Sequence, residues 1–132
     1  MKSRDSLIRL KRFQVDEKRR RVAQIEAMIN EFSRMATDLD REIASEEQKT
    51  NNTDPSHFAY STYARAARGR RDNLKQSAGE LRGQLEEAKR HLEEANEELL
   101  KAQSLEGREK SSERAAETIA DMGFMGLRAA SV

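Results

Sequence analysis

Apolar side chains recur with heptad spacing along the N-terminal part of the chain. Six positions spaced seven apart are all apolar: Ile8, Val15, Val22, Ile29, Ala36 and Ile43. The positions three residues further on are apolar in the middle of this segment, at Ile25, Phe32 and Leu39. No proline or glycine interrupts the first 49 residues. The pattern predicts a long helix over about residues 3–49 with one apolar seam for a partner helix.

The heptad pattern stops in a segment rich in turn-forming residues. Residues 49–56 contain Asn, Thr, Asp and Pro, which together indicate a turn. Asp54 before Pro55 is also a favourable helix start, because the carboxylate accepts from first-turn amides and proline at the first helical position loses no hydrogen bond. We therefore expect a turn over residues 50–54 and a second helix over about 55–118.

The second helix carries its own apolar seam, with steps that alternate between four and three residues. Leucine and alanine alternate through its second half, which favours close packing against a partner helix. The seam consists of Tyr60, Ala64, Ala67, Arg71, Leu74, Ala78, Leu81, Leu85, Ala88, Leu92, Ala95, Leu99 and Ala102. The prediction is one all-α domain over residues 1–121, a long two-helix coiled-coil hairpin. Residues 122–132, which include two glycines, are expected to be a frayed tail.

The charge distribution favours an antiparallel arrangement. Residues 1–21 carry nine basic and three acidic side chains (net +6), and residues 22–48 carry two and seven (net −5). Residues 58–82 carry six and two (net +4), and residues 83–106 carry three and seven (net −4). Folding at the turn sets opposite charges side by side, whereas a parallel two-chain zipper would pair like charges. We expect a hairpin that is monomeric when free.

Composition and length exclude several classes of protein. Of 132 residues, 37% are charged, 36% are hydrophobic and none is cysteine. Disulfide scaffolds, thiolate metal sites and cysteine nucleophiles are therefore excluded. No apolar run approaches the roughly 18–20 residues that cross a bilayer, and no signal peptide is visible at the start. We expect a cytoplasmic chain without direct membrane insertion.

Residues that could support catalysis or cofactor binding are sparse. His57 and His91 have no partner at metal-ligand spacing, and the acidic pairs of the second helix are typical of a solvated helix face. A two-helix hairpin also offers no enclosed pocket. We expect no enzymatic activity, no cofactor and no metal. The basic residues of 1–21 are scattered around the helix and face the acidic residues of 83–106, which argues against nucleic-acid binding.

Three of the six aromatic residues cluster after the turn: Phe58, Tyr60 and Tyr63. They either close the hairpin beneath the turn or form a docking surface, since aromatic residues are enriched at interface hot spots. The sequence leaves both interpretations open. Leu10 and Phe13 lie off the first seam near the N-terminus, and they too either close that end of the hairpin or form a docking surface.

Two segments resemble the flagellar export protein family FliJ, in particular its alphaproteobacterial branch. They are residues 3–20, SRDSLIRLKRFQVDEKRR, and residues 54–60, DPSHFAY. Their order, the segment lengths and the position of the turn extend the resemblance over about residues 1–105. The resemblance implies a non-enzymatic part of the flagellar type III export apparatus, with a coiled coil like the central stalk of rotary ATPases.

The resemblance also implies partners and contact residues. The partners are the export ATPase ring and its regulator, the membrane-embedded export gate and export chaperones, at the cytoplasmic face of the inner membrane at the flagellar base. By analogy, the paired terminal halves would enter the ring, with contacts at Arg9, Arg12, Phe13, Leu92 and Leu99. The tip would face the gate, with contacts at His57, Phe58, Tyr60 and Tyr63. The alternative is a generic cytoplasmic coiled-coil tether or a holdase chaperone without an ATPase partner.

Overall fold

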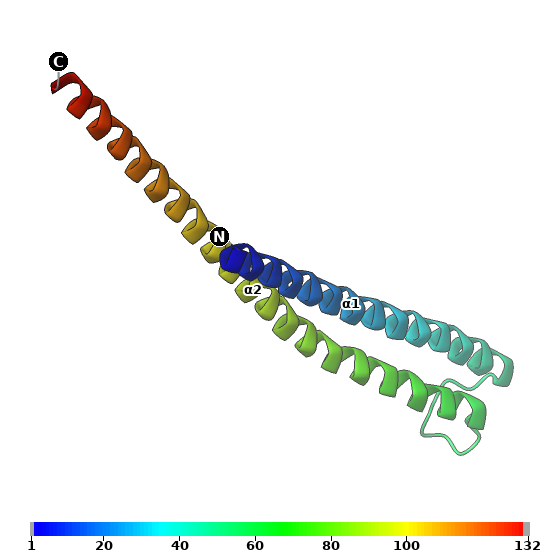
Figure 1. Ribbon diagram of the computed structural model, residues 1–132. Helices are drawn as coiled ribbons and strands as arrows, with labels where there is room; N and C mark the ends of the chain where they lie inside the picture. The colour runs from blue at the N-terminus through cyan, green and yellow to red at the C-terminus, as the bar shows by residue number, and fades with distance from the viewer. Residues whose placement is uncertain (1, 131–132) are drawn as a thin grey trace. The chain divides into compact units, whose positions relative to one another are not determined.

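The protein is an all-α helical hairpin, as the sequence predicts. A computed structural model describes the backbone of residues 2–130 and the side chains of residues 3–122. Helix α1 spans Lys2–Thr50 and helix α2 spans Thr62–Ala130, and the described backbone contains no strand. The loop between the helices reverses the chain, so they run antiparallel where they pack together (Figure 1).

The hairpin divides into two compact units. The first, called the loop unit here, is Lys18–His91 and contains the connection between the helices. The second, called the terminal unit, consists of Met1–Glu17 and Leu92–Val132. Both helices pass through both units, so each unit buries its own section of the two predicted seams.

The core of the loop unit is formed by the centre of both seams. Ile25, Leu81 and Ala88 are buried together, and Ile25 is the largest fully buried side chain, at 1% exposure. Four partly buried side chains pack against this cluster: Val22, Ile29, Phe32 and Leu85. Nearer the loop, five further seam residues are buried: Ala36, Ile43, Ala64, Ala67 and Ala78. Apolar burial along the seam, rather than intrinsic propensity, accounts for most of the stability of such helices.

The core of the terminal unit is also formed by seam residues of both helices. Its buried side chains are branched on α1 and small on α2. Ile8 and Val15 of α1 are buried, and so are Ala95 and Ala102 of α2. The leucines that alternate with these alanines on α2, Leu92 and Leu99, are half-buried. The predicted seam positions are therefore confirmed in this unit too.

Ion pairs between the helices follow the predicted charge pattern. In the terminal unit, Arg4 and Lys11 of the basic part of α1 pair with acidic residues of α2, Glu109 at 2.6 Å and Glu98 at 2.8 Å. In the loop unit the polarity is reversed, because the acidic residues belong to α1. There Arg68 lies 3.7 Å from Glu47. Each unit thus has complementary charges beside its apolar seam.

One level of the seam in the loop unit is polar. Arg71 occupies a predicted seam position, and its Nη1 donates a hydrogen bond to Oδ1 of Asp40 at 3.0 Å. Its Nε and Nη2 also donate to Oδ1 of Asp72. The pKa of Arg71 is raised above its ordinary value, and the hydrogen bond to Asp40 is the main cause. A polar pair at a seam position fixes the register of two helices at some cost in stability.

The end of α1 is a Schellman motif. Asn51 adopts a left-handed conformation with φ 53°. Its amide donates to the carbonyl of Gln48, and the Asn52 amide donates to the carbonyl of Glu47. Asparagine tolerates this conformation better than most side chains, so it can take the position that glycine usually occupies.

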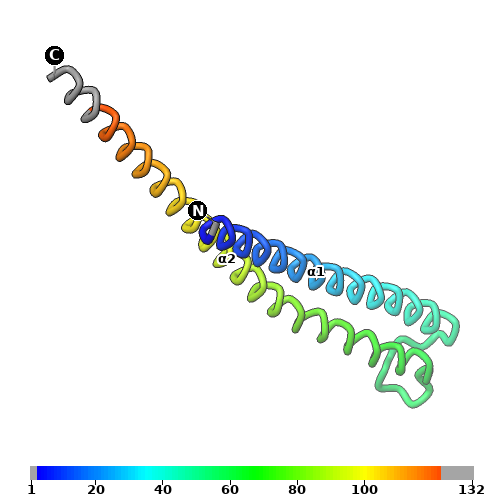
Figure 2. Tube along the Cα trace, in the orientation of Figure 1, coloured from blue at the N-terminus to red at the C-terminus, as the bar shows by residue number. Residues whose placement is uncertain are grey.

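The second helix begins later than predicted, at Thr62 rather than near residue 55. Asp54 does accept hydrogen bonds, but from the amide and hydroxyl of Ser56, so it caps a tight turn instead of a helix. The helix N-cap is Ser61, whose Oγ accepts from the Ala64 amide at 3.2 Å. Figure 2 shows the resulting irregular connection between the two helices.

The helix also ends later than predicted. We expected helix to about residue 118 and a frayed tail over residues 122–132, whereas α2 continues to Ala130. No proline follows Pro55, so no residue of this helix-breaking type interrupts α2 before Ala130. Residues 131 and 132 lie outside the described part of the chain.

Candidate protein-docking surfaces

The terminal unit exposes an apolar and basic surface on α1. Leu10 and Phe13 are 50% and 55% exposed, although both are large apolar side chains. Helical periodicity explains this, because a position five residues before the buried Val15, or five after the buried Ile8, lies far around the helix from the seam. Arg9 and Arg12 are exposed on the same two turns. These four residues, called the α1 patch here, combine one aromatic and one aliphatic side chain with two guanidinium groups. Phenylalanine and arginine are both enriched at protein interfaces.

Leu92 and Leu99, the two leucines expected to contact the ATPase ring together with Arg9, Arg12 and Phe13, are placed differently. Leu92 and Leu99 are half-buried seam residues of α2, so most of each side chain packs inside the terminal unit. Beside them, Lys11 donates to Oε2 of Glu98 at 2.8 Å, and this hydrogen bond holds the pKa of Glu98 below its ordinary value. The structure therefore brings Arg9, Arg12 and Phe13 together at the surface and assigns the leucines a packing role.

The aromatic residues after the turn have separate roles in the structure. Tyr60 is 4% exposed, and its hydroxyl donates to Oε1 of Glu47 at 2.7 Å. Burial, followed by this hydrogen bond, raises the pKa of Tyr60. Tyr63 is half-exposed, and its hydroxyl donates to Glu42 at 3.1 Å. Tyr60 in the loop and Tyr63 on α2 thus both bind to acidic residues near the end of α1. The burial of Tyr60 agrees with the interpretation in which these aromatic residues close the hairpin beneath the turn.

Phe58, in contrast, does not close the hairpin. Its side chain is 94% exposed, the highest value among the large apolar residues described. The only ring stacked on it among the described residues is that of His57, with centroids 4.7 Å apart. Phe58 is therefore accessible to a partner protein, and aromatic residues are enriched at interface hot spots.

Hydrogen bonds hold the loop that presents Phe58. Nδ1 of His57 accepts from the Ala59 amide at 3.0 Å and lies 3.3 Å from the side-chain nitrogen of Asn52. The hydroxyl and the amide of Ser56 both donate hydrogen bonds to Asp54. They lower the pKa of that carboxyl group, and the hydroxyl contributes more than the amide. Backbone bonds from His57 to Asp54 and from Tyr60 to His57 close two successive turns. The exposed Phe58 is therefore carried by a structured loop, which limits the entropy lost on binding.

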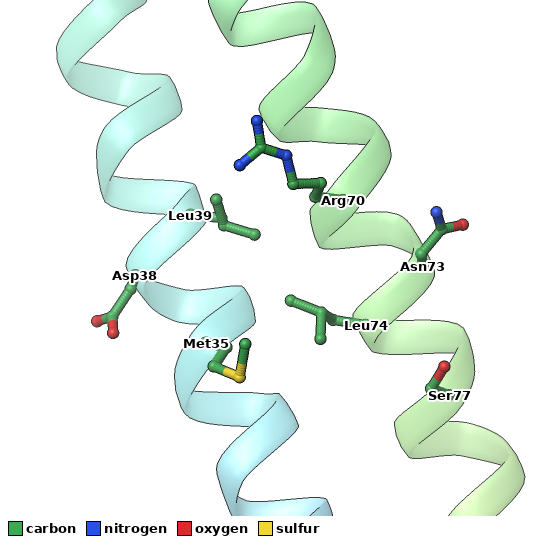
Figure 3. A pocket seen from close by; sticks show the side chains of 7 residues that line it. All are labelled: Met35, Asp38, Leu39, Arg70, Asn73, Leu74 and Ser77. Atoms are coloured by element: carbon green, nitrogen blue, oxygen red, sulfur yellow. The ribbon is translucent and has the colours of Figure 1, made fainter.

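A groove in the loop unit was not predicted from the sequence. It is lined by Met35, Asp38 and Leu39 of α1 and by Arg70, Asn73, Leu74 and Ser77 of α2, with a volume of about 480 Å³. Figure 3 shows Met35, Leu39 and Leu74 turned toward the space between the helices. Leu39 and Leu74 were predicted only as seam residues. That their outer edges form a groove with Met35 depends on how the two helices meet, which one-dimensional periodicity does not report.

Among the side chains of residues 3–122, no group of three or more His, Cys, Asp or Glu residues is placed to hold a metal ion. Within the described backbone, neither helix has a stretch long and apolar enough to cross a membrane. No known protein family, curated protein or solved structure matches the chain.

Proposed function

We propose that this chain is a non-enzymatic, stalk-like component of the flagellar type III export apparatus that binds the export ATPase ring, promotes its assembly and couples it to the export gate. The observation that carries the proposal is that a helical hairpin rich in charged residues exposes an aromatic side chain in each unit, Phe13 in the terminal unit and Phe58 in the loop unit. The resemblance of residues 3–20 and 54–60 to the flagellar export family FliJ supplies the identity of the partners.

The α1 patch is the proposed ATPase contact. Phe13 and Leu10 supply apolar area, and Arg9 and Arg12 supply charges that an acidic ring interior would attract. Contacts of this kind are fast and salt-sensitive, because exposed charges steer association and are screened by salt. A stalk that meets several ring positions in turn needs such adaptable contacts more than one deep pocket.

The loop carrying Phe58 is the proposed contact with the export gate. His57 stacks on Phe58, while Tyr60 and Tyr63 hold the loop against α1 and therefore act indirectly. The proposal places the protein at the cytoplasmic face of the inner membrane, at the flagellar base. It includes the ATPase regulator and export chaperones as further partners.

Two single substitutions test the two contacts separately. We expect Phe13→Ala to weaken binding to the export ATPase of the same cell by about tenfold, and Phe58→Ala to weaken binding to the cytoplasmic domain of the gate by a similar factor. Each variant should leave the other interaction unchanged. Leu100→Ala is the matched control, since Leu100 is 64% exposed in the terminal unit but lies outside the α1 patch.

Three outcomes would contradict the proposal. One is an absence of binding to both partners at low salt, and another is an equal effect of Leu100→Ala and Phe13→Ala on ATPase binding. The third is suppression of the aggregation of unrelated unfolded proteins without ATPase binding, which would favour the holdase alternative.

A further inference from the structure

We propose that the groove formed by Met35, Leu39 and Leu74 is a docking site for an amphipathic helix of a partner protein, and that this helix carries acidic residues along one flank. The site lies in the loop unit and shares no residue with the α1 patch or with the loop that carries Phe58. The proposal therefore stands apart from the proposed function.

The floor of the groove has the apolar character that a helix requires. Met35 is 42% exposed, and the half-buried Leu39 and Leu74 present their outer edges from opposite helices. Two helices alone cannot cover the outer edges of their seam residues, whereas a third helix laid along the groove would bury all three side chains. Recognition of helices in grooves uses such apolar anchors at i, i+3 and i+4 spacing, and methionine adapts readily to different partners.

The charge of the occupant follows from Arg70. The neighbouring arginines of α2 are engaged: Arg68 with Glu47, Arg71 with Asp40, and Arg65 over the ring of Tyr60. No ion pair involves Arg70 in the part of the chain whose side chains are described. Its guanidinium extends toward the space above Leu39 (Figure 3). An exposed guanidinium beside an apolar floor favours a carboxylate on the bound helix.

The opposite rim does not oppose an acidic helix strongly. Asp38 lines the groove, but its carboxylate points away from it in Figure 3 and lies 3.9 Å from Arg41. Asn73 and Ser77 complete the α2 side with neutral polar groups. The electrostatic asymmetry therefore directs the acidic flank of the helix toward α2.

The test uses the full chain and two synthetic peptides of about 18 residues, long enough to form a helix when bound. Both peptides carry leucines at heptad positions and glutamine elsewhere. One has glutamates along one flank, and the other has lysines in their place. Binding is measured by fluorescence anisotropy at low and at physiological salt, and circular dichroism verifies that each variant remains folded.

Two pairs of variants separate the groove from general stickiness. Met35→Glu should weaken binding of the acidic peptide by at least about tenfold, because a charge would be placed on the apolar floor. Met28→Glu is its control, since Met28 lies one heptad earlier on α1, is 43% exposed and is not part of the groove lining. Arg70→Glu should weaken binding about fivefold, whereas Lys75→Glu, the same change of charge outside the groove, should have less than about a twofold effect.

The expected result is preferential binding of the acidic peptide, lost in Met35→Glu and Arg70→Glu and retained in both controls. Equal effects of Met35→Glu and Met28→Glu would overturn the proposal, as would equal binding of the two peptides. Concentration-dependent dimers that disappear in Met35→Glu would also overturn it, because a second copy of this chain would then occupy the groove.

Discussion

Substitution of the most deeply buried side chain tests whether the seam holds the hairpin together. Ile25→Ala removes three carbon atoms from a residue that is 1% exposed and lies against Leu81 and Ala88. At about 0.8 kcal/mol for each buried methylene, the lost transfer free energy is about 2.4 kcal/mol. The cavity adds to this loss, although a layer only two helices thick can partly collapse. We therefore expect the free energy of unfolding to fall by about 3 kcal/mol.

The assay is urea unfolding followed by circular dichroism at 222 nm, with the slope of the transition as a check on two-state behaviour. Met28→Ala is the control on the same helix, because Met28 is 43% exposed. Its substitution should cost less than about 1 kcal/mol. Similar losses for the two variants would refute the idea that one apolar seam stabilises the loop unit, and would indicate that charged side chains or helix propensity dominate.

Further predictions concern Gly83 of α2, the ion pair between Lys11 and Glu98, and the hydrogen bond of Tyr60. Gly83→Ala should raise the free energy of unfolding by up to about 1 kcal/mol, since a Cβ atom there would meet nothing within 4 Å; a loss of stability in urea unfolding would contradict this. Lys11→Met should return the carboxyl titration of Glu98, followed by NMR, to its ordinary value. In the native protein the pKa of Glu98 is lowered, so the pair contributes stability above about pH 4.5 that is lost as the pH falls through the lowered pKa. Tyr60→Phe should lower the free energy of unfolding by about 1 kcal/mol, because it removes the hydrogen bond to Glu47; an unchanged midpoint would show that this bond contributes nothing net.

Periodicity was a reliable guide to packing because it is a local property of each helix. Positions such as Ile25, Ala64 and Leu81 were predicted to face the partner helix, and all three are buried. Tyr60 was also placed correctly in the seam, although it lies in the loop rather than on α2. The opposite net charges of the facing segments likewise predicted which helix supplies the basic residue of an interhelical pair, as in Lys11 with Glu98.

Features that depend on competition or on three-dimensional juxtaposition were not predictable in the same way. Asp54 and Ser61 are both residue types that can form an N-cap. Ser61 takes this role because Tyr60 and Ser61 itself donate hydrogen bonds to acidic side chains of α1, which fixes where α2 begins. The partner of Arg71, Asp40, lies beside the predicted seam of α1 and not on it. The different roles of Phe58 and Tyr60, two residues apart, likewise follow from the path of the loop and not from residue type.

Binding to the flagellar export ATPase of the same cell is the most direct test of the proposed function. The wild-type chain should co-migrate with the ATPase at low salt, shift it toward hexameric rings and raise its hydrolysis rate, and these effects should weaken as salt screens the α1 patch. If the ATPase elutes unchanged at low salt and hydrolyses ATP at the same rate with and without the chain, the stalk proposal is wrong.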